Sequence, residues 1–328
     1  MAPSRKAAVP PMTSDISFRR TVDRALVHRY AVSEVFITDL VEAGPDRALI
    51  GAQLPLSHSY FLDSSDDRSG YGATLLTECA RQACTYLAHT RYDVPLGWSF
   101  LMSEMSVQLT GDHALRVSDR PAELTMAAQT RTELRDGRLR TLWADLELLV
   151  DGAPAGRITG EGRYLTREEY EFLRLGPRTG AVPLSSALPV RPEGVPVPPA
   201  LVGRRDPRNV LLVDARRIGH ALEARLGVPG NHPTIFDHPL DHYPGMALIE
   251  AAGQAALLAL ALEHPGGGWD TVLDLRATFS RFAELDADIS VRARAEQQAD
   301  GSASAAVGFR QGGETLAEFR LLVARSGS

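Results

Sequence analysis

The sequence predicts an α+β fold built from two copies of one unit, in which an antiparallel sheet wraps around a long helix. A strand, a polar loop, a helix and four strand-like segments occur once before residue 175 and again after residue 208. The helix of the second copy, 247–262, is apolar on almost every face, so we expect it to be buried. Turn dipeptides such as Asp136-Gly137 and Asp151-Gly152 separate the later segments, which favours antiparallel hairpins.

In the first copy, alternating apolar residues predict one strand within 27–40 and another within 48–56. A polar loop, 64–70, leads into a helix at 73–92. Four further strands are predicted at 98–109, 122–134, 139–150 and 156–165. Thr166 then begins a short helix through Leu173, with Glu169 completing a capping box.

Residues 176–207 contain eight prolines, which favours an extended linker. We therefore divide the chain into a leader (1–20), a first domain (21–175), this linker and a second domain (208–328). The leader carries basic residues but no apolar segment, so no signal peptide is expected.

The second copy matches the first at corresponding places. Glu250-Ala-Ala-Gly-Gln254 corresponds to Glu78-Cys-Ala-Arg-Gln82, and the strand-like run 210–214 corresponds to 35–39. This duplication is the strongest structural signal in the sequence. The remaining strands are predicted at 272–282, 287–295, 302–309 and 315–324.

Composition narrows the classes of function. A net charge of −6 argues against a nucleic-acid partner, which would require a basic face. The apolar helix falls short of the roughly 20 residues that a membrane span needs, so no membrane is expected. Cys79 and Cys84 are too few for a disulfide framework. We expect a cytoplasmic protein.

The chemistry is concentrated where a loop with two histidines meets the second helix. His238 and His242 are four residues apart, but Pro239 and Pro244 place them on a loop and no third ligand follows, so a metal site is not expected. Glu250 lies within the apolar helix, where a carboxylate is costly unless it is paired or functional.

The run Asp237-His-Pro-x-Asp-His-x-Pro-Gly-Met246, followed by Glu250-x-x-x-Gln254, resembles the active-site segment of hotdog β-hydroxyacyl-carrier-protein dehydratases. Over 24–165 and 205–325 the chain more closely resembles the A-factor biosynthesis family of tandem-hotdog γ-butyrolactone synthases. That resemblance implies a double hotdog, in which two antiparallel sheets wrap two long central helices as a pseudo-two-fold dimer within one chain.

The resemblance also implies a reaction. A β-ketoacyl group would move from acyl carrier protein, on its phosphopantetheine arm, to the hydroxyl of dihydroxyacetone phosphate, as the first step toward a γ-butyrolactone-type signal. No metal or redox cofactor is implied. Two departures from the family pattern, Gly253 in place of an arginine and a first loop without the histidine run, would leave one site intact and degrade its pseudo-symmetric counterpart.

Each candidate residue has a structural alternative. Glu78 is either a general base, tuned by an apolar setting that disfavours its charged form, or a structural acid bonded to Arg81 one turn away. Arg81 either clamps the substrate phosphate or holds Glu78. Glu250 is either catalytic or a relic that orders the interface, and His238 either shuttles a proton or bonds backbone to shape the turn.

The start of the second helix is expected to bind substrate, through Gly245, Met246 and His242. The N–H groups of Gly245 and Met246 lack helical partners and would polarise a thioester carbonyl, although Pro-Gly also has an ordinary capping role. Asp237 and Asp241 are interpreted as loop formers. Glycines at 156, 160 and 162 have no following dinucleotide helix, so we assign them no phosphate-binding role.

The predicted site thus lies between the halves, with the loop of the second copy facing the first helix. Two other functions stay open. A hotdog dehydratase or thioesterase would share the histidine loop and the acid on the helix, and a non-catalytic acyl- or lactone-binding regulator would use the space beside a buried helix.

Overall fold

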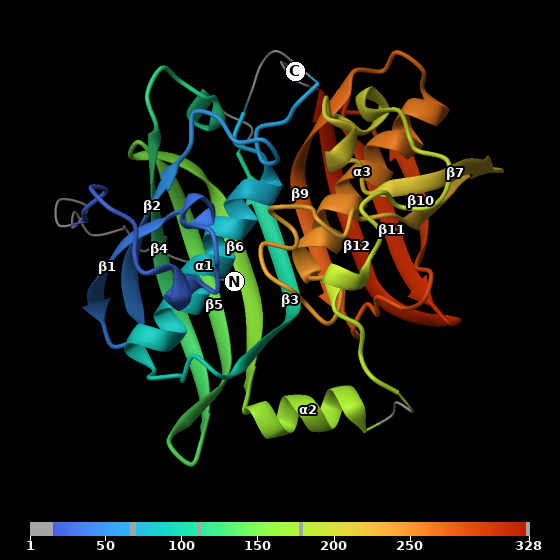
Figure 1. Cartoon of the computed structure of the whole chain (residues 1–328). Helices are drawn as coiled ribbons and strands as arrows, with labels where there is room; N and C mark the ends of the chain where they lie inside the picture. The colour runs from blue at the N-terminus through green and yellow to red at the C-terminus, as the bar shows by residue number, and fades with distance from the viewer. Residues whose placement is uncertain (1–15, 66–69, 111–112, 177–179, 326–328) are drawn as a thin grey trace, which may run out of the picture.

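The computed structural model describes residues 16–65, 70–110, 113–176 and 180–325. It shows one antiparallel sheet of twelve strands in the order β1-β2-β4-β5-β6-β3-β9-β12-β11-β10-β8-β7, with the first copy on the left of Figure 1 and the second on the right. The strands are β1 Ile37–Gly44, β2 Arg47–Leu54, β3 Ser99–Leu109, β4 Ala122–Arg135, β5 Arg138–Val150, β6 Ala153–Leu165, β7 Leu212–Ile218, β8 Ala221–Leu226, β9 Trp269–Phe279, β10 Ser290–Gln297, β11 Ala303–Gln311 and β12 Glu314–Arg325.

The strand order reads the same from either edge, with β1 corresponding to β7 and β3 to β9. The two halves are therefore related as a pseudo-dimer within one chain. They meet where β3 pairs with β9, with Met105 opposite Ala277 and Val107 opposite Leu275. The two predicted sheets are thus continuous across this junction.

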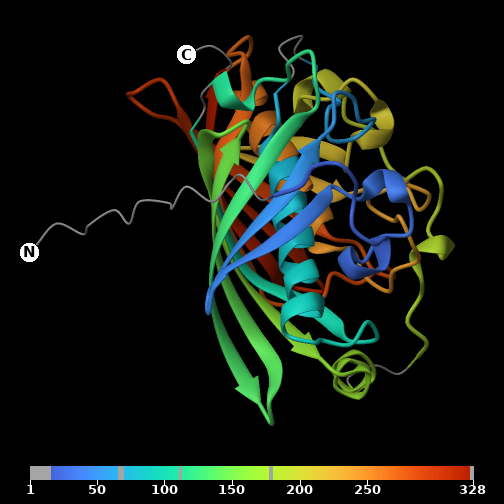
Figure 2. The same cartoon turned by 90° about the vertical axis from the view of Figure 1, so that its left-hand side faces the viewer.

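Two long helices lie against the concave side of the sheet, α1 (Ala73–Arg91) in the first copy and α3 (Gly245–Glu263) in the second. Figure 2 shows α1 inside the curve of the strands. At 19 residues α3 is longer than expected, and by length and apolarity it matches a membrane span. It packs inside the sheet, with 72% of its most apolar window buried. Burial rather than length accounts for its apolar surface.

The hairpin turns follow the prediction. Asp136 and Gly137, with φ of 54° and 73°, connect β4 to β5, and Asp151 and Gly152, with φ of 48° and 81°, connect β5 to β6. Positive φ at both central residues matches the right-handed twist of the flanking strands. The capping box at Thr166 and Glu169 is also present, and it begins α2 (Arg167–Leu175), the helix below the sheet in Figure 1.

The segment before β1 differs from the prediction. Two short 3-10 helices, Arg24–Val27 and Val32–Glu34, replace the first part of the strand expected within 27–40. Some of the apolar residues that predicted a strand here are buried in the core without forming one. Val27, for example, is fully buried although it lies in no strand. The sequence analysis also missed β8. Residues 1–15 of the expected leader and 66–69 of the first loop lie outside the described residues.

The proline-rich segment contains regular turns as well as extended chain. Short 3-10 helices occupy Pro199–Val202 and Pro207–Asn209. They stand in the second copy where Arg24–Val27 and Val32–Glu34 stand in the first. The end of the segment interpreted as a linker is therefore structurally part of the second copy.

Candidate functional site

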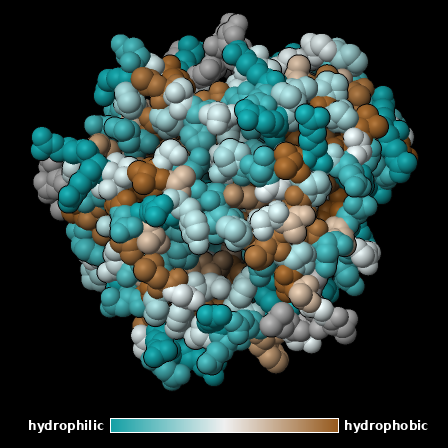
Figure 3. Space-filling model, viewed as in Figure 1, coloured by the Kyte–Doolittle hydropathy of each residue, from teal (hydrophilic) through white to brown (hydrophobic). Residues whose placement is uncertain are grey.

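A cavity of about 570 Å³ lies between the halves. The first copy contributes Glu78 and Arg81 from α1, and the second contributes His238, Gly245 and Met246 from its loop and the start of α3. This volume is typical of a small-molecule site. The structure therefore brings together the loop and the helix that the sequence analysis placed opposite each other. The outer face of the molecule shown in Figure 3 mixes hydrophilic and hydrophobic residues.

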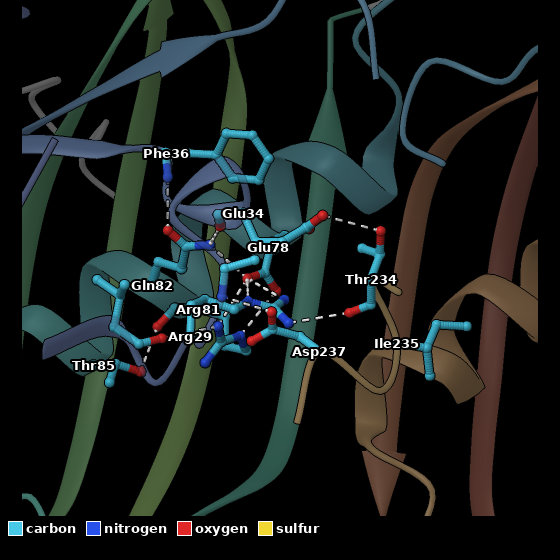
Figure 4. A network of polar contacts seen from close by, with 12 residues as sticks. Arg29, Glu34, Phe36, Glu78, Arg81, Gln82, Thr85, Thr234, Ile235 and Asp237 are labelled. Carbon is cyan, nitrogen blue, oxygen red and sulfur yellow. Dashed lines mark hydrogen bonds and ion pairs between the residues drawn. The ribbon is translucent and has the colours of Figure 1, made fainter. Parts of the chain in front are cut away.

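Glu78 is the centre of a buried ionic network that Figure 4 shows from close by. Its Oε1 lies 2.6 Å from Arg29 Nη2, 2.8 Å from Arg81 Nη2 and 2.7 Å from Gln82 Nε2. Its Oε2 accepts a hydrogen bond from Arg81 Nε at 2.8 Å. The carboxylate is thus held by two guanidinium groups and an amide, although its side chain is fully buried.

This network lowers the pKa of Glu78, whereas the sequence analysis expected its surroundings to disfavour the charged form. Burial alone would raise the pKa of the carboxyl, but the charges of Arg29 and Arg81, with hydrogen bonds from Arg81 and Gln82, lower that pKa to about 2. The expectation that an apolar setting disfavours the charged form is wrong, because the setting is not apolar. A carboxylate this acidic is a weak proton acceptor at neutral pH, and its contacts match the structural alternative.

Arg81 lines the cavity, and only part of its guanidinium binds other protein groups. Its Nε and Nη2 bind Glu78, and Nη2 also donates to the carbonyl of Val27 at 3.2 Å. Among the described residues, Nη1 has no hydrogen-bond partner. The side chain is 23% exposed and lines the cavity. A guanidinium fixed on one edge and open on the other suits an anionic group of a substrate.

Arg29, which the sequence analysis missed, joins the two copies. Its Nε and Nη2 bind Glu78, while Nη1 donates to the carbonyl of Thr234 at 3.1 Å in the second copy. The repeat offered a signal, because Arg204 occupies the corresponding place before Pro207–Asn209. Without coordinates, the different sequences around the two arginines conceal this correspondence.

His238 lines the cavity and contacts a carboxylate and an aromatic ring. Its Nδ1 lies 3.5 Å from Asp237 Oδ2, and its ring stacks on that of Tyr30 with centroids 4.8 Å apart. Burial lowers the pKa of His238, and the Asp237 carboxylate partly offsets that shift. The imidazole is therefore neutral at pH 7. With Nδ1 directed at a carboxylate, Nε2 is left as the proton-accepting atom.

Asp237 connects the copies rather than forming a turn within its own loop. Its two oxygens accept hydrogen bonds from the backbone N–H groups of Tyr30 at 2.6 Å and Ala31 at 2.9 Å. Asp237 thereby holds the His238 loop against the first copy. The interpretation of Asp237 as a local loop former is wrong in this respect, because its partners lie about 200 residues away in sequence.

His242 and Asp241 attach the same loop to α2. His242 Nδ1 lies 2.6 Å from Asp241 Oδ1, and that carboxylate also accepts from the Tyr170 hydroxyl at 2.8 Å and from Arg174 Nε at 3.1 Å. Burial opposes ionisation of Asp241, but these partners leave its pKa well below the usual range. His242 lines the cavity. Asp241 is therefore a tether to α2, not an Asx-type turn residue.

Gly245 begins α3 after the N-cap residue Pro244, and both residues line the cavity together with Met246. The first N–H groups of a helix lack intrahelical acceptors, so those of Gly245 and Met246 are suited to a substrate oxygen. Space also restricts this position. A Cβ on Gly245 would lie 3.2 Å from the terminal methyl of Met102 and 3.5 Å from the Phe279 ring.

Glu250 does not share the cavity. Arg204 Nη2 lies 2.5 Å from its Oε1, Gln254 Nε2 donates to the same oxygen at 2.7 Å, and the Thr74 hydroxyl donates to Oε2 at 2.9 Å. Burial raises the pKa of Glu250, but Arg204 and the hydrogen bonds more than offset that rise. The structure separates Glu250 from the other predicted catalytic residues, and its contacts favour the ordering alternative.

The sequence analysis also missed a pair of histidines beside the site. His28 Nε2 lies 2.9 Å from His89 Nε2, and His89 Nδ1 lies 2.6 Å from the carbonyl of Val94. Because a carbonyl only accepts, His89 carries its proton on Nδ1 and His28 donates from Nε2. Burial, followed by the charge of Arg81, lowers the pKa of His28 to about 3, so this cavity-lining imidazole stays neutral.

A curved antiparallel sheet around two central helices, with a site between the copies, defines a tandem hotdog protein. A solved structure described as an oleoyl thioesterase from Lactobacillus plantarum shares this fold. The two superpose with a TM-score of 0.53 over 87% of this chain and 99% of that one, at 10% sequence identity.

The sequence then gives the family. The chain belongs to the AfsA family, because the sequence model of the A-factor biosynthesis hotdog domain matches residues 12–166 and 187–324. A 2-oxo-3-(phosphooxy)propyl 3-oxoalkanoate synthase of Streptomyces virginiae is 35% identical over 287 residues, which cover 85% of this chain and 89% of that protein. Proteins with the same description from Streptomyces coelicolor and Streptomyces griseus are 33% and 31% identical and cover 83% and 94% of this chain, and 81% and 93% of their own lengths.

Proposed function

We propose that this protein is an acyltransferase that moves a 3-oxoacyl (β-ketoacyl) group from acyl carrier protein to the hydroxyl of dihydroxyacetone phosphate. The description of its relatives names an ester with a 2-oxo-3-(phosphooxy)propyl part and a 3-oxoalkanoate part. The observation that carries the proposal is the free Nη1 edge of Arg81 in a cavity shared with His238 and the start of α3. Arg81 suits the phosphate of the acceptor, because guanidinium and phosphate form strong, directional hydrogen bonds.

In the proposed reaction, the hydroxyl oxygen of the acceptor attacks the thioester carbonyl carbon. The new C–O bond forms, the C–S bond breaks, and the hydroxyl proton passes to His238 Nε2 and then to the departing thiolate. Asp237 stabilises the transient imidazolium, and the N–H groups of Gly245 and Met246 bind the carbonyl oxygen as it gains charge. The reaction needs no covalent acyl-enzyme, because holding both substrates together supplies much of the rate.

Glu78 has a positioning role in this proposal. Its pKa of about 2 makes it a poor acceptor for a hydroxyl proton, whereas its two oxygens fix the Nε edge of Arg81. His238 is a stronger base than His28, because Asp237 supports its charged form, whereas burial and the charge of Arg81 lower the pKa of His28 to about 3. His242 is assigned to substrate binding.

The test combines purified protein, a 3-oxoacyl carrier protein and dihydroxyacetone phosphate, with mass spectrometry of the products. The phosphorylated ester and free carrier thiol are expected in equal amounts. Release of 3-oxo acid without the acceptor would identify a thioesterase, and loss of water from a 3-hydroxyacyl carrier protein would identify a dehydratase. Tight acyl or lactone binding without any turnover would identify a regulator.

A further inference from the structure

Two glycines in β6, Gly160 and Gly162, line the cavity but have no part in the proposed chemistry. They alternate along the strand with Ile158 and Tyr164, each 2% exposed. Successive side chains of a strand point to opposite faces, so all four positions face the interior of the first copy. The two glycines therefore leave space where β6 passes α1.

The second copy fills the same space. Gly160 pairs with Ala144 of β5, and in the second copy Leu321 of β12 pairs with Ala305 of β11. Two residues further on, Val323 takes the place of Gly162. The side chains of Leu321 and Val323 are 3% and 0% exposed. The strands correspond, but one presents glycines to its helix and the other presents large apolar side chains.

Backbone geometry does not require these glycines. Neither has a positive φ, and a Cβ would lie 3.4 Å from its nearest neighbour at Gly160 and 3.5 Å at Gly162. By contrast, Gly156 has a φ of 152°, and a Cβ there would lie 2.3 Å from the carbonyl of Gln108. Glycine inside a strand lowers stability. Both glycines line the cavity, so larger side chains at these positions would take up cavity volume.

The other walls of this space match an acyl chain. Ala80 and Cys84 line the cavity from α1, and Ala144 and Leu146 line it from β5. This inference rests on the proposed function. We propose that the acyl chain of the donor lies between α1 and the β5–β6 pair of the first copy. Gly160 and Gly162 then determine the length of the acyl chain that the site accepts. The corresponding space in the second copy is closed by Leu321 and Val323, so it accepts no chain.

The test transfers the side chains of the second copy to the first, as Gly160→Leu and Gly162→Val. Calorimetry measures binding of 3-oxoacyl pantetheines from acetoacetyl to 3-oxododecanoyl to the full-length protein. Wild-type affinity is expected to rise about fourfold per methylene while the chain still gains buried surface. In both variants this rise should stop at a shorter chain, with acetoacetyl binding retained. Gly160→Ala, which adds one methyl group, should shorten the limit least.

Gly308→Leu is the matched control. Gly308 lies in β11 between the buried residues Val307 and Phe309, on the opposite face, and a Cβ there meets nothing within 4 Å. This variant should keep the wild-type dependence on chain length. An unchanged dependence in Gly160→Leu, Gly162→Val and Gly160→Ala would overturn the inference, as would equal losses for short and long chains.

The same series separates this inference from the proposed function. If the length limit shifts in binding but no donor reacts with dihydroxyacetone phosphate, the acyl path is supported and the acyltransferase assignment fails. If the ester forms with an unshifted chain-length preference in all three variants, the function is supported and the acyl path is wrong.

Discussion

Each copy of the fold buries a glutamate on its central helix, and the two glutamates differ in what surrounds them. Glu78 binds Arg29 and also Arg81, whose side chain lines the cavity. Glu250 binds Arg204 and the Thr74 hydroxyl, and Gly253 stands where the first copy has Arg81. The comparison shows that the carboxylate–arginine pair belongs to the duplicated framework, whereas the open guanidinium belongs to one copy alone.

A glutamine on each helix confirms that the framework is shared. Gln82 accepts from the N–H of Phe36 at 2.9 Å and donates to the carbonyl of Glu34 at 2.7 Å. Gln254 makes the equivalent bonds to Leu211 at 2.8 Å and Asn209 at 2.7 Å. Each glutamine thus fastens its helix to the segment that enters the first strand. Duplication preserved the bonds that stabilise the fold, and differences accumulated around the cavity.

The largest effect is expected from making the loop of the second copy resemble that of the first. Asp63 accepts hydrogen bonds from the backbone N–H groups of Arg205 and Asp206, just as Asp237 does from those of Tyr30 and Ala31. The residue after Asp63 is Ser64, whereas the residue after Asp237 is His238. His238→Ser should lower kcat/KM by about 10²- to 10⁴-fold, because it removes the proton acceptor. Steady-state assay of ester formation measures this change.

The pH profile distinguishes proton transfer from mere packing at His238. The imidazole accepts a proton only when neutral, and burial places its pKa below 6.5. Wild-type kcat/KM should therefore be constant from pH 7 upward and fall about tenfold per pH unit below that pKa. The residual activity of His238→Ser should lack this acid limb. An identical acid limb in the variant would assign the titration to another group.

The sequence was sufficient for those parts of the fold that depend on local pattern. The helices α1 and α3, the hairpin turns and the capping box follow from periodicity and turn chemistry. The duplication also identified Glu78 and Glu250 as equivalent, and the departure at Gly253 indicated which of the two pseudo-symmetric sites is degraded. These signals lie within short stretches or repeat at a fixed spacing, so they can be read without coordinates.

The partners of the ionisable groups could not be read in this way. Glu78 has one arginine a turn away, which was visible, and a second at Arg29, which reaches it only because the 3-10 segment folds back over α1. That second cation acts with Arg81 to lower the pKa of Glu78, which burial alone would raise. The histidine pair His28 and His89 was equally hidden, since its members are 61 residues apart.

The next largest effect is on stability, and here the two copies should behave alike. Glu78→Gln and Glu250→Gln each leave a buried arginine without its countercharge, so each should lower the free energy of unfolding by about 3–5 kcal/mol. Denaturant titration at pH 7 measures both. Activity should separate them, because only Glu78→Gln releases Arg81, whereas folded Glu250→Gln should retain most of its kcat/KM.

Acid provides a second comparison for the same variants. The pKa of Glu78 is depressed to about 2, so its contribution to stability is complete above its ordinary value of 4.5 and is lost as the pH falls toward 2. Glu78→Gln should therefore flatten the decline of stability with acid. A variant that declines as steeply as wild type would show that Glu78 is not paired as described.

The smallest change makes the first helix resemble the second, through Arg81→Gly. The free energy of unfolding should fall by roughly 1 kcal/mol because glycine is unfavourable inside a helix, while Arg29 and Gln82 still bind the Glu78 carboxylate. The loss should appear in kcat/KM for dihydroxyacetone phosphate, by roughly 10- to 150-fold, which corresponds to the 1.5–3 kcal/mol of a hydrogen bond to a charged group. Unphosphorylated dihydroxyacetone is the control acceptor, and its slower reaction should be nearly unaffected. An equal loss with both acceptors would show that Arg81 supports the site as a whole, and the phosphate would then need another partner.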